Sequence, residues 1–465
     1  MNIEQLYTEC LAQGAYYIKS KNEAVIIDPL REVNQYIEKA NKDGVKIKYI
    51  IETHFHADFV SGHVDLSKKT GATIIFGPNA DTNIDAYIAK DDEEFFFGDV
   101  SFKVLHTPGH TLESSCFLLK DSNKKDIAVF TGDTLFIGDV GRPDLAQKTN
   151  HITKNDLAGM LYDSLQNKIL KLNDDVLVYP AHGAGSACGK NMSKETYSTI
   201  GEQKENNYAL RNGITKQEFI EEVTDGILPP PGYFGLNVSM NKNGYDSMDE
   251  IFKRSLNPLS LNEFCDYIED DTVILDTRNA SDFAQKHIPK SISIGLEGQF
   301  APWVGAIFPN LDKKIVLICS LGKEKETIIR LSRVGYDQVI GFLYGGIDTW
   351  INNNKKIASI DRISPEELSE LHGDVKNIID VRKPGEFDSE HVENAISLPL
   401  DFIRDNISQY PDGQLFIHCA GGYRSIIAAS ILKANGYDNL CDVIGGYDAI
   451  SKTTIPKTEF VCPNS

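Results

Sequence analysis

The sequence is poor in the features that mark membrane, nucleic-acid-binding and disulfide-rich proteins. No apolar run reaches the length of a membrane span, and the first residues lack the basic-then-apolar pattern of a secretion signal. Its eight cysteines are scattered without a C-x-x-C pair, as in proteins of a reducing cytoplasm. The net charge of −20 repels nucleic acid and anionic membranes, and no basic stripe counters it. We therefore expect a cytoplasmic protein without nucleic-acid or membrane partners.

The chain does have the bulk of several globular domains. Its 465 residues, 41% of them apolar and 25% charged, suffice for about two to four domains. Strand-like apolar runs alternate with segments of helical spacing, which favours multidomain α/β construction. We expect a large domain at residues 1–232, a linker or wrapping arm at 233–258, and smaller domains at 259–357 and 358–465.

The most informative stretch follows the strand-like run 45–51. His54, His56 and Asp58 stand at alternate positions, so these potential ligands face one side of an extended segment. Three further strand ends carry ligand-type residues in loops with Gly or Pro: Thr107-Pro-Gly-His110, Thr131-Gly-Asp133 and Pro180-Ala-His182. Loops fixed by rigid strands are where functional residues concentrate. Four such strand ends predict one metal site.

In this order and spacing, H-x-H-x-D, T-P-G-H, T-G-D-T-L-F and P-A-H-G resemble the metallo-β-lactamase superfamily. The resemblance implies an αββα sandwich with metal at one edge of its two sheets. Members with two metals normally continue the first motif with a histidine, where this chain has Phe59. A phenyl ring cannot ligate a metal, so the sequence disfavours a two-metal hydrolase centre.

The remaining pattern is similar to that of the mononuclear persulfide dioxygenases of this superfamily. The resemblance implies one Fe(II) per chain, held by His54, His110 and Asp133, the donor set of non-haem iron(II) oxygenases. Zinc suits the same donor atoms, so iron rests on the resemblance and on the coordination positions left open. Three side chains would then orient the ligands or a bound water by hydrogen bonds: His56, Asp58 and His182.

Two loops beside these motifs hold auxiliary candidates. Arg142 follows Asp133 in a polar, glycine-flanked segment. We expect it either to hold the loop through Asp139 or Asp144 or to contact substrate. Cys188 lies between small residues and close to a lysine, in a loop resembling that of the persulfide dioxygenase–rhodanese fusions. An exposed, partly ionised thiol and a buried, inert one both agree with this pattern.

The second half of the chain is an internal repeat with a spacing of about 100 residues, beginning at Leu259. The run 274–278 matches 378–382, the run 316–319 matches 416–419, and the pair 345–346 matches 445–446. Each repeat alternates strands with helical segments. This predicts two small α/β domains.

The second repeat carries Cys419-Ala-Gly-Gly-Tyr-Arg424 between a strand and a helix. A glycine loop there can turn N–H groups toward a thiolate, and the helix N-terminus and Arg424 add positive potential. A pKa of about 8.5 lowered by about two units makes a cysteine mostly ionised at pH 7. The loop resembles that of rhodanese sulfurtransferases, which implies that Cys419 carries sulfane sulfur as a persulfide. Its auxiliary candidates are Gly421, Gly422, Tyr423 and Ser425.

The first repeat departs from this pattern at its loop, Cys319-Ser-Leu-Gly-Lys-Glu324. Glu324 stands where the second repeat has arginine, and its charge would repel a thiolate or an anionic substrate. We expect Leu321 to occupy an inward-turning position, with two lysines offsetting the acidic charge in part. We interpret this repeat as a degenerate rhodanese-like domain.

The order of a metal domain, a degenerate rhodanese and an active rhodanese is similar to bacterial persulfide dioxygenase–sulfurtransferase fusions. The resemblance implies that O2 oxidises a thiol persulfide, such as that of glutathione or coenzyme A, to sulfite. Cys419 would move sulfur between a persulfide and sulfite or thiosulfate in sulfide detoxification. We also expect a homo-oligomer. Two alternatives stay open: a glyoxalase II-like thioester hydrolase fused to a sulfurtransferase, and a sulfur-relay protein whose lactamase-like domain is a scaffold.

Overall fold

The computed structural model describes residues 1–147, 152–269 and 272–462. The chain divides into two compact units. The first unit holds residues 1–248 with 332–335, and the second holds 249–331 with 336–465. No helix among the described residues is long and apolar enough to cross a membrane.

The first unit is built on two six-stranded sheets. One sheet has the order β1 (Asn2–Thr8), β2 (Gln13–Ser20), β3 (Glu23–Ile27), β4 (Lys46–Glu52), β5 (Thr73–Phe76) and β6 (Tyr87–Ile88). The other has the order β12 (Ser198–Thr199), β11 (Leu177–Pro180), β10 (Asp126–Gly132), β9 (Ser115–Lys120), β8 (Val100–His106) and β7 (Glu94–Phe97). The sheets pack on a shared core in which Ile18 and Ile51 of the first meet Phe102, Phe117 and Phe130 of the second.

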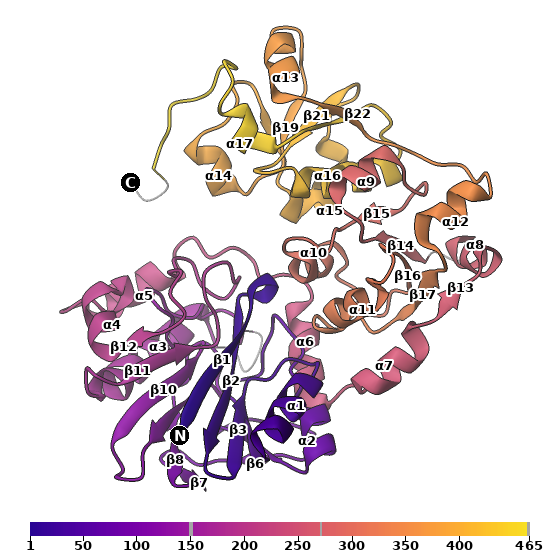
Figure 1. The fold of residues 1–465 in the computed structure, drawn as a ribbon. Helices are drawn as coiled ribbons and strands as arrows, with labels where there is room; N and C mark the ends of the chain where they lie inside the picture. The colour runs from indigo at the N-terminus through magenta and orange to yellow at the C-terminus, as the bar shows by residue number, and fades with distance from the viewer. Residues whose placement is uncertain (148–151, 270–271, 463–465) are drawn as a thin grey trace. The chain divides into compact units, whose positions relative to one another are not determined.

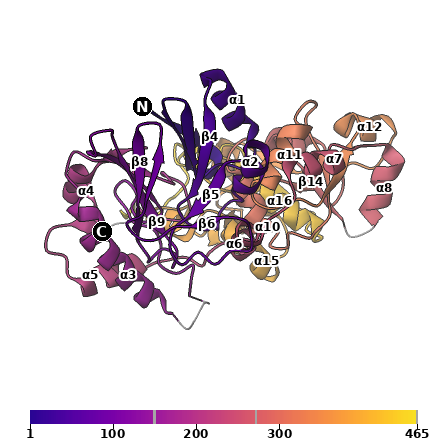
Figure 2. The same ribbon diagram turned by 90° about the horizontal axis from the view of Figure 1, so that it is seen from below.

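Helices cover the outer face of each sheet (Figure 1). On the first sheet lie α1 (Asn34–Asp43) and α2 (His63–Thr70), whose buried Tyr36 and Leu66 join the core of that face. On the second lie α3 (Lys154–Asn167), α4 (Ile200–Asn206) and α5 (Lys216–Thr224). Each of these last three begins at a threonine whose side chain caps the first turn, with an acidic residue three positions on. The layers are therefore α, β, β, α, and the turned view shows the same order (Figure 2).

The segment expected to link the domains is largely helical. It contains α6 (Phe234–Asn243) and α7 (Met248–Ser255). Within the first unit, the buried Asn241 of α6 donates its amide hydrogens to the carbonyl oxygens of His56 and Phe59, both at 2.8 Å. This helix thus fixes the backbone of the H-x-H-x-D loop.

The second unit holds two five-stranded parallel sheets with matching strand orders. The first has the order β13 (Pro258–Leu259), β17 (Val339–Leu343), β16 (Ile315–Ile318), β14 (Val273–Asp276) and β15 (Ile292–Ser293). The second has the order β18 (Asp361–Ile363), β22 (Leu440–Val443), β21 (Leu415–His418), β19 (Ile378–Asp380) and β20 (Ile396–Ser397). Central strands such as β16 are apolar throughout and fully buried, as parallel strands covered on both faces are.

The helices of the second unit connect these strands. In the first repeat they are α8 (Leu261–Glu269), α9 (Ala280–Gln285), α10 (Phe300–Ile307), α11 (Glu324–Ser332) and α12 (Gly346–Asn352). In the second they are α13 (Pro365–Leu371), α14 (Pro384–Ser389), α15 (Ile403–Asn406), α16 (Tyr423–Ala434) and α17 (Gly446–Ile450). The α/β fold class predicted from the repeat is confirmed.

Candidate functional site

Loops after β4, β8 and β10 bring His54, His110 and Asp133 together. Asp133 Oδ2 lies 3.8 Å from Nε2 of His54 and 3.4 Å from Nε2 of His110. One ligand atom from each of the three residues lies within 4.8 Å of the others. All three side chains are buried. Two imidazoles and a carboxylate therefore converge on one point, as the sequence predicts.

Hydrogen bonds place the proton of His54 and of His110 on Nδ1, so that Nε2 of each ring keeps a lone pair for a metal. The carbonyl oxygen of Arg142 can only accept, so Nδ1 of His110, at 2.9 Å, carries the proton. The hydroxyl of Thr53 donates to Asp28 and therefore accepts from Nδ1 of His54, at 3.0 Å. Burial and the neighbouring histidines lower the pKa of His54 well below its usual value, which keeps it in the neutral, ligating form.

Several buried polar atoms of this cluster lack a hydrogen-bond partner among the described residues, which bears on whether a metal ion fits there. Both carboxylate oxygens of Asp133 and Nε2 of His110 are buried and have no hydrogen-bond partner among the described residues. A buried carboxylate with no compensating donor is strongly disfavoured, whereas a cation satisfies it. The donor set suits iron(II) and zinc. The cluster therefore fits a metal ion.

A second cluster surrounds Cys419 at the carboxyl end of β21. The N–H of Gly422 donates to Cys419 Sγ at 3.1 Å, and the thiol lies 3.7 Å from Oγ of Ser425. Gly446 lets the next loop approach closely, because its φ is +57° and a Cβ there would lie 2.4 Å from the Cys419 carbonyl oxygen. The N–H of Tyr447 donates to that oxygen at 2.7 Å. The loop holds the cysteine, 1% exposed, with an N–H donor aimed at its sulfur.

Arg424 is held by Glu386 of α14 in a two-pronged pair of 2.7 and 2.8 Å. Burial opposes the charged guanidinium, but the pair with Glu386 outweighs it and raises the pKa of Arg424. Of the other loop candidates, Gly421 is exposed and Tyr423 is turned to the first repeat, where its hydroxyl donates to the carbonyl oxygen of Gly295 at 2.7 Å.

Comparisons with known proteins agree with both clusters. Residues 9–182 match the family model of the metallo-beta-lactamase superfamily, and residues 260–353 and 364–453 match that of the rhodanese-like domain. The chain is 30% identical over 225 residues to the mitochondrial persulfide dioxygenase ETHE1 of Homo sapiens, covering 48% of this chain and 80% of that protein. It belongs to the metallo-β-lactamase superfamily. Two rhodanese-like domains follow.

A hydrolase and a solved structure are also similar to it. A probable hydroxyacylglutathione hydrolase of Schizosaccharomyces pombe is 32% identical over 166 residues, which is 35% of this chain and only 60% of that protein. The crystal structure of a metallo-beta-lactamase from Staphylococcus aureus subsp. aureus COL aligns with a TM-score of 0.64 and 29% identity, covering 74% of this chain and 98% of the other. The predicted αββα lactamase sandwich followed by rhodanese-like domains is confirmed.

The three side chains expected to support the metal ligands offer ligand atoms that lie within 4.8 Å of one another, but their other partners differ. In the lactamase domain, His182 Nε2 lies 3.4 Å from Asp58 Oδ2 and 3.7 Å from Asp133 Oδ1. His56 instead meets two buried carboxylates, with Nε2 at 3.1 Å from Asp28 and 3.5 Å from Glu52. Burial lowers the pKa of His56, but Asp28 and Glu52 outweigh it and raise the pKa to about 9.

Sequence reasoning missed Asp28, Glu52 and His63. Asp28 accepts hydrogen bonds from the N–H and the hydroxyl of Thr53, at 2.8 and 2.9 Å, and so fixes the turn that begins the H-x-H-x-D loop. Glu52 lies 3.2 Å from Nδ1 of His63. The available signal for Asp28 and Glu52 was an acidic residue directly after the apolar strand β3 and another at the end of its neighbour β4.

Arg142 is largely engaged by protein partners. Its guanidinium donates to Asp144 at 2.6 and 2.8 Å and to the carbonyl oxygens of Ala187 at 3.1 Å and Leu228 at 2.6 Å. Its own N–H donates to the carbonyl oxygen of Cys188 at 3.0 Å. These bonds fit the loop-holding alternative, with Asp144 as the partner. Asp139 accepts from the backbone of the Cys188 loop instead.

Of the two alternatives left open for Cys188, the structure has the buried thiol. The thiol is 1% exposed, and burial followed by the charges of Asp58 and Asp133 raises its pKa well above its usual value. The bonds from Arg142 to this loop turn the cysteine inward. Its Sγ lies within 4.8 Å of ligand atoms of Asp133 and His182.

Phe59 occupies a closed position beside the metal cluster. Its ring is 0% exposed and lies 4.3 Å from the ring of His56 and 6.5 Å from that of His182, measured between centroids. The position where a second-metal histidine stands in other superfamily members is therefore filled by hydrocarbon.

The first rhodanese-like loop differs electrostatically from the second. Burial raises the pKa of Cys319 to about 11, with a further contribution from Glu324 at the start of α11. The hydroxyl of Thr327 lies 3.5 Å from the thiol. The expected inward position of Leu321 is wrong, since 73% of that side chain is exposed. It aligns with Gly421, which is also exposed, so this loop position faces solvent in both repeats.

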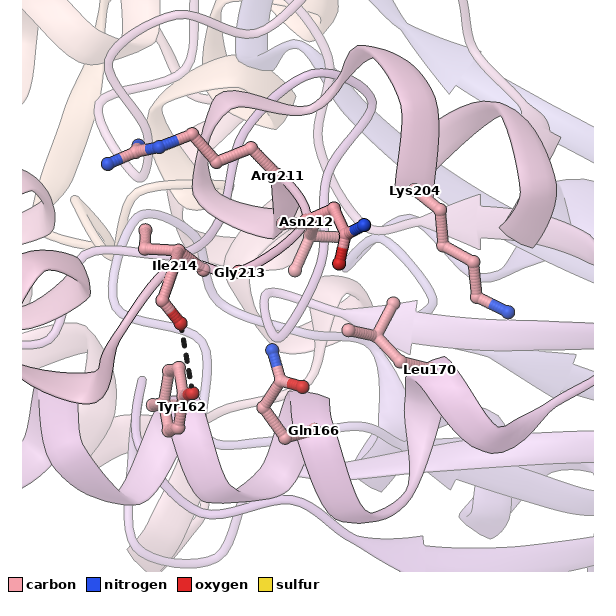
Figure 3. A pocket seen from close by; sticks show the side chains of 9 residues that line it. Tyr162, Gln166, Leu170, Lys204, Arg211, Asn212, Gly213 and Ile214 are labelled. Atoms are coloured by element: carbon pink, nitrogen blue, oxygen red, sulfur yellow. Dashed lines mark hydrogen bonds between the residues drawn. The ribbon is translucent and has the colours of Figure 1, made fainter.

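A surface pocket of about 520 Å³ lies apart from these clusters, between α3 and the segment that follows α4 (Figure 3). Its lining includes Tyr162, whose hydroxyl donates to the carbonyl oxygen of Ile214 at 3.1 Å. Its two cations are already paired, Lys204 with Asp174 and Arg211 with Glu222. None of the predicted site residues lines it, and we assign it no function.

Proposed function

We propose that this chain uses iron(II) to oxidise a low-molecular-weight thiol persulfide to sulfite with O2, and that it transfers sulfane sulfur through Cys419. The observation that carries the proposal is the buried set of His54, His110 and Asp133 with unsatisfied polar atoms, beside a phenylalanine where a second metal would bind. Similarity to a protein named persulfide dioxygenase supports it. Bound iron(II) would supply the redox chemistry that O2 requires.

The chain's own residues set the conditions for that reaction. Arg142 O and Thr53 hold the protons of the two histidines on Nδ1, so Nε2 stays available for the metal. Phe59 and the buried surroundings exclude water from one side of the site. The balanced reaction takes R–S–SH, O2 and H2O to R–SH, sulfite and two protons.

The rhodanese step consumes this product. The Cys419 thiolate attacks the outer sulfur of a second persulfide, the S–S bond breaks, and the thiol leaves as R–S⁻. Sulfite then takes that sulfur from the Cys419 persulfide to form thiosulfate; the S–S bond breaks, the persulfide proton is released, and the thiolate is restored. Gly422 N–H stabilises the sulfur anion before and after the step. Two linked sites raise the effective concentration of sulfite at Cys419.

Oxygen uptake by the iron-loaded chain with glutathione and coenzyme A persulfides tests the first activity. We expect uptake with at least one of these persulfides and loss of uptake in Asp133→Asn, which removes the carboxylate charge. Asp126→Asn is the matched control, because Asp126 lies at the opposite end of β10 and pairs with Lys120. No uptake by an iron-loaded wild-type chain with either persulfide would refute the oxidation.

A thioester hydrolase is the second candidate, since a hydroxyacylglutathione hydrolase is about as similar to the chain as the dioxygenase. Phe59 opposes this candidate, because the hydrolase centre needs a second metal. Release of thiol from a hydroxyacylglutathione, measured with zinc and with iron, distinguishes the two reactions. We expect no release above that of the metal-free chain.

A further inference from the structure

The two rhodanese-like domains meet at the Cys419 loop. The hydroxyl of Tyr423, in that loop, donates to the carbonyl oxygen of Gly295 in the first domain at 2.7 Å. Tyr423 is the first residue of α16 and directly follows Gly422, whose N–H points at the Cys419 sulfur at 3.1 Å. A shift of the Tyr423 backbone therefore moves the donor that the thiolate needs.

The acceptor is itself held from both domains. In the first domain, the guanidinium of Arg330 donates to the carbonyl oxygen of Leu296 at 2.6 Å and pairs with Glu326 at the same distance. In the second, Oγ of Ser430 accepts from the N–H of Ser293 at 3.0 Å. The segment 293–296 is thus fixed to α11 on one side and to α16 on the other.

A second chain of hydrogen bonds connects the first rhodanese-like domain to Cys419 through Arg362, Asp442 and Ser425. Arg362 on β18 donates to Oγ of Ser281 in the first domain at 2.8 Å and to Oδ2 of Asp442 at 3.0 Å. Oδ1 of Asp442 accepts from the hydroxyl of Ser425 at 2.6 Å, and that hydroxyl lies 3.7 Å from the thiol. Asp442 is 0% exposed, so Arg362 is the cation that offsets a buried negative charge behind the cysteine.

The first repeat does not reproduce this connection. With Cys319 and Gly345 matched to Cys419 and Gly445, the positions of Ser425 and Asp442 hold Lys325 and Phe342. The buried hydroxyl–carboxylate pair therefore occurs only in the repeat whose loop also carries an arginine.

We propose that the first rhodanese-like domain is a positioning part of the Cys419 site and acts on it through Tyr423 and Arg362. The inference rests on the proposed role of Cys419 as sulfur carrier. Tyr423 holds Gly422 N–H against the sulfur, and Arg362 limits the repulsion of the thiolate by Asp442. Other charged or titratable groups also surround the loop. Arg424 has Glu386 as its partner and Asp401 nearby, and Asp448 lies near Gly421. On the strand side, the buried His418 lies beside the pair of Asp380 and Arg382.

Tyr423→Phe in the full chain removes the contact between the domains and keeps the ring. Tyr437→Phe is the matched control, because that hydroxyl donates to Ile407 within the second domain at 2.8 Å. We expect Tyr423→Phe to lower kcat/KM for thiosulfate-linked sulfur transfer about two- to tenfold, the range for one lost hydrogen bond. We also expect it to move the pH midpoint of Cys419 alkylation upward, measured on the Cys419 peptide by mass spectrometry. The control leaves both unchanged.

Arg362→Met tests the second connection by the same two measurements. We expect a higher alkylation midpoint, and we expect Asp442→Asn in the same chain to return it toward the wild-type value. Ser281 lies in the first rhodanese-like domain, outside the core of the second. We expect Ser281→Ala to raise the alkylation midpoint by less than Arg362→Met does. If the Tyr423, Arg362 and Ser281 variants alkylate as the wild type does, the inference is wrong. A wild-type chain without sulfur transfer would refute the proposed function instead, while the alkylation profiles would still test the connection.

Discussion

Replacing Phe59 with histidine tests the reading of the metal cluster directly. The phenyl ring is fully buried, 4.3 Å from the ring of His56. A newly buried polar group without a partner costs about 1–3 kcal/mol. Part of the phenyl burial is also lost, at about 1 kcal/mol. We therefore expect the metal-free Phe59→His chain to be about 2–4 kcal/mol less stable than the wild type.

Zinc should offset much of this loss, because the new imidazole would lie beside His56 and His182, which with Asp58 already offer ligand atoms within 4.8 Å of one another. A cation at about one hundred times its Kd adds about 2.7 kcal/mol to the stability of the state that binds it. Urea unfolding with and without zinc measures this gain, and elemental analysis counts the metal. We expect Phe59→His to bind one zinc more per chain than the wild type.

Phe55→His is the matched control in the same loop. Phe55 is also buried, but its ring packs on Phe76, 4.8 Å away, in the core between the first sheet and its helices. It should lose similar stability and gain nothing from zinc. If Phe59→His binds no additional zinc and zinc restores none of its stability, then Phe59 is not what limits the site to one metal.

Three further predictions concern the second unit. Cys419→Ser should lower sulfur transfer by roughly a thousandfold or more, because a hydroxyl is hardly ionised, while persulfide-dependent oxygen uptake persists; loss of both would contradict the two-site division. Cys319→Ser should leave both activities unchanged, and a loss of sulfur transfer would contradict its degenerate role. Burial lowers the pKa of His287 to about 4 from 6.5, so the unfolded chain binds the additional proton between these pH values. Stability should fall as pH falls through that window, by at most about 3 kcal/mol, and His287→Asn should flatten the dependence in urea unfolding.

The elements were predictable where local pattern and tertiary packing agree. The spacing of residues 33–42 predicts a helix, and α1 spans Asn34–Asp43, because its apolar stripe is also the face buried on the first sheet. The run 415–418 before the cysteine loop predicts a strand, and β21 spans Leu415–His418, buried throughout. Strand ends were equally predictable, and the loops after β4, β8 and β10 meet because rigid strands of two packed sheets fix them. The choice of His54, His110 and Asp133 among the loop residues rested on the family resemblance.

Contacts fixed by tertiary hydrogen bonds were not predictable. Whether Cys188 faces solvent depends on bonds from Arg142, a residue 46 positions earlier, and the sequence does not specify that Arg142 bonds to the Cys188 loop. The role of Asp28 depends on the pairing of β3 with β4, which places Thr53 against it. His56 follows from the same contact, since its partners are Asp28 and Glu52. In each case a polar side chain acts through a residue distant in sequence, for which periodicity carries no signal.

The two rhodanese-like repeats, compared with each other, show which features the fold requires and which belong only to the repeat with Cys419. Both keep an Asp–Arg pair at 2.6 Å, Asp276 with Arg278 at the end of β14 and Asp380 with Arg382 at the end of β19. Both also keep a glycine at positive φ beneath the cysteine loop. Only the second has Arg424 and the buried Ser425–Asp442 pair. The first repeat thus keeps the backbone of the cysteine loop without the charged side chains that surround Cys419 in the second. It can therefore lack the surroundings that a reactive cysteine needs and still present the Gly295 carbonyl oxygen to Tyr423.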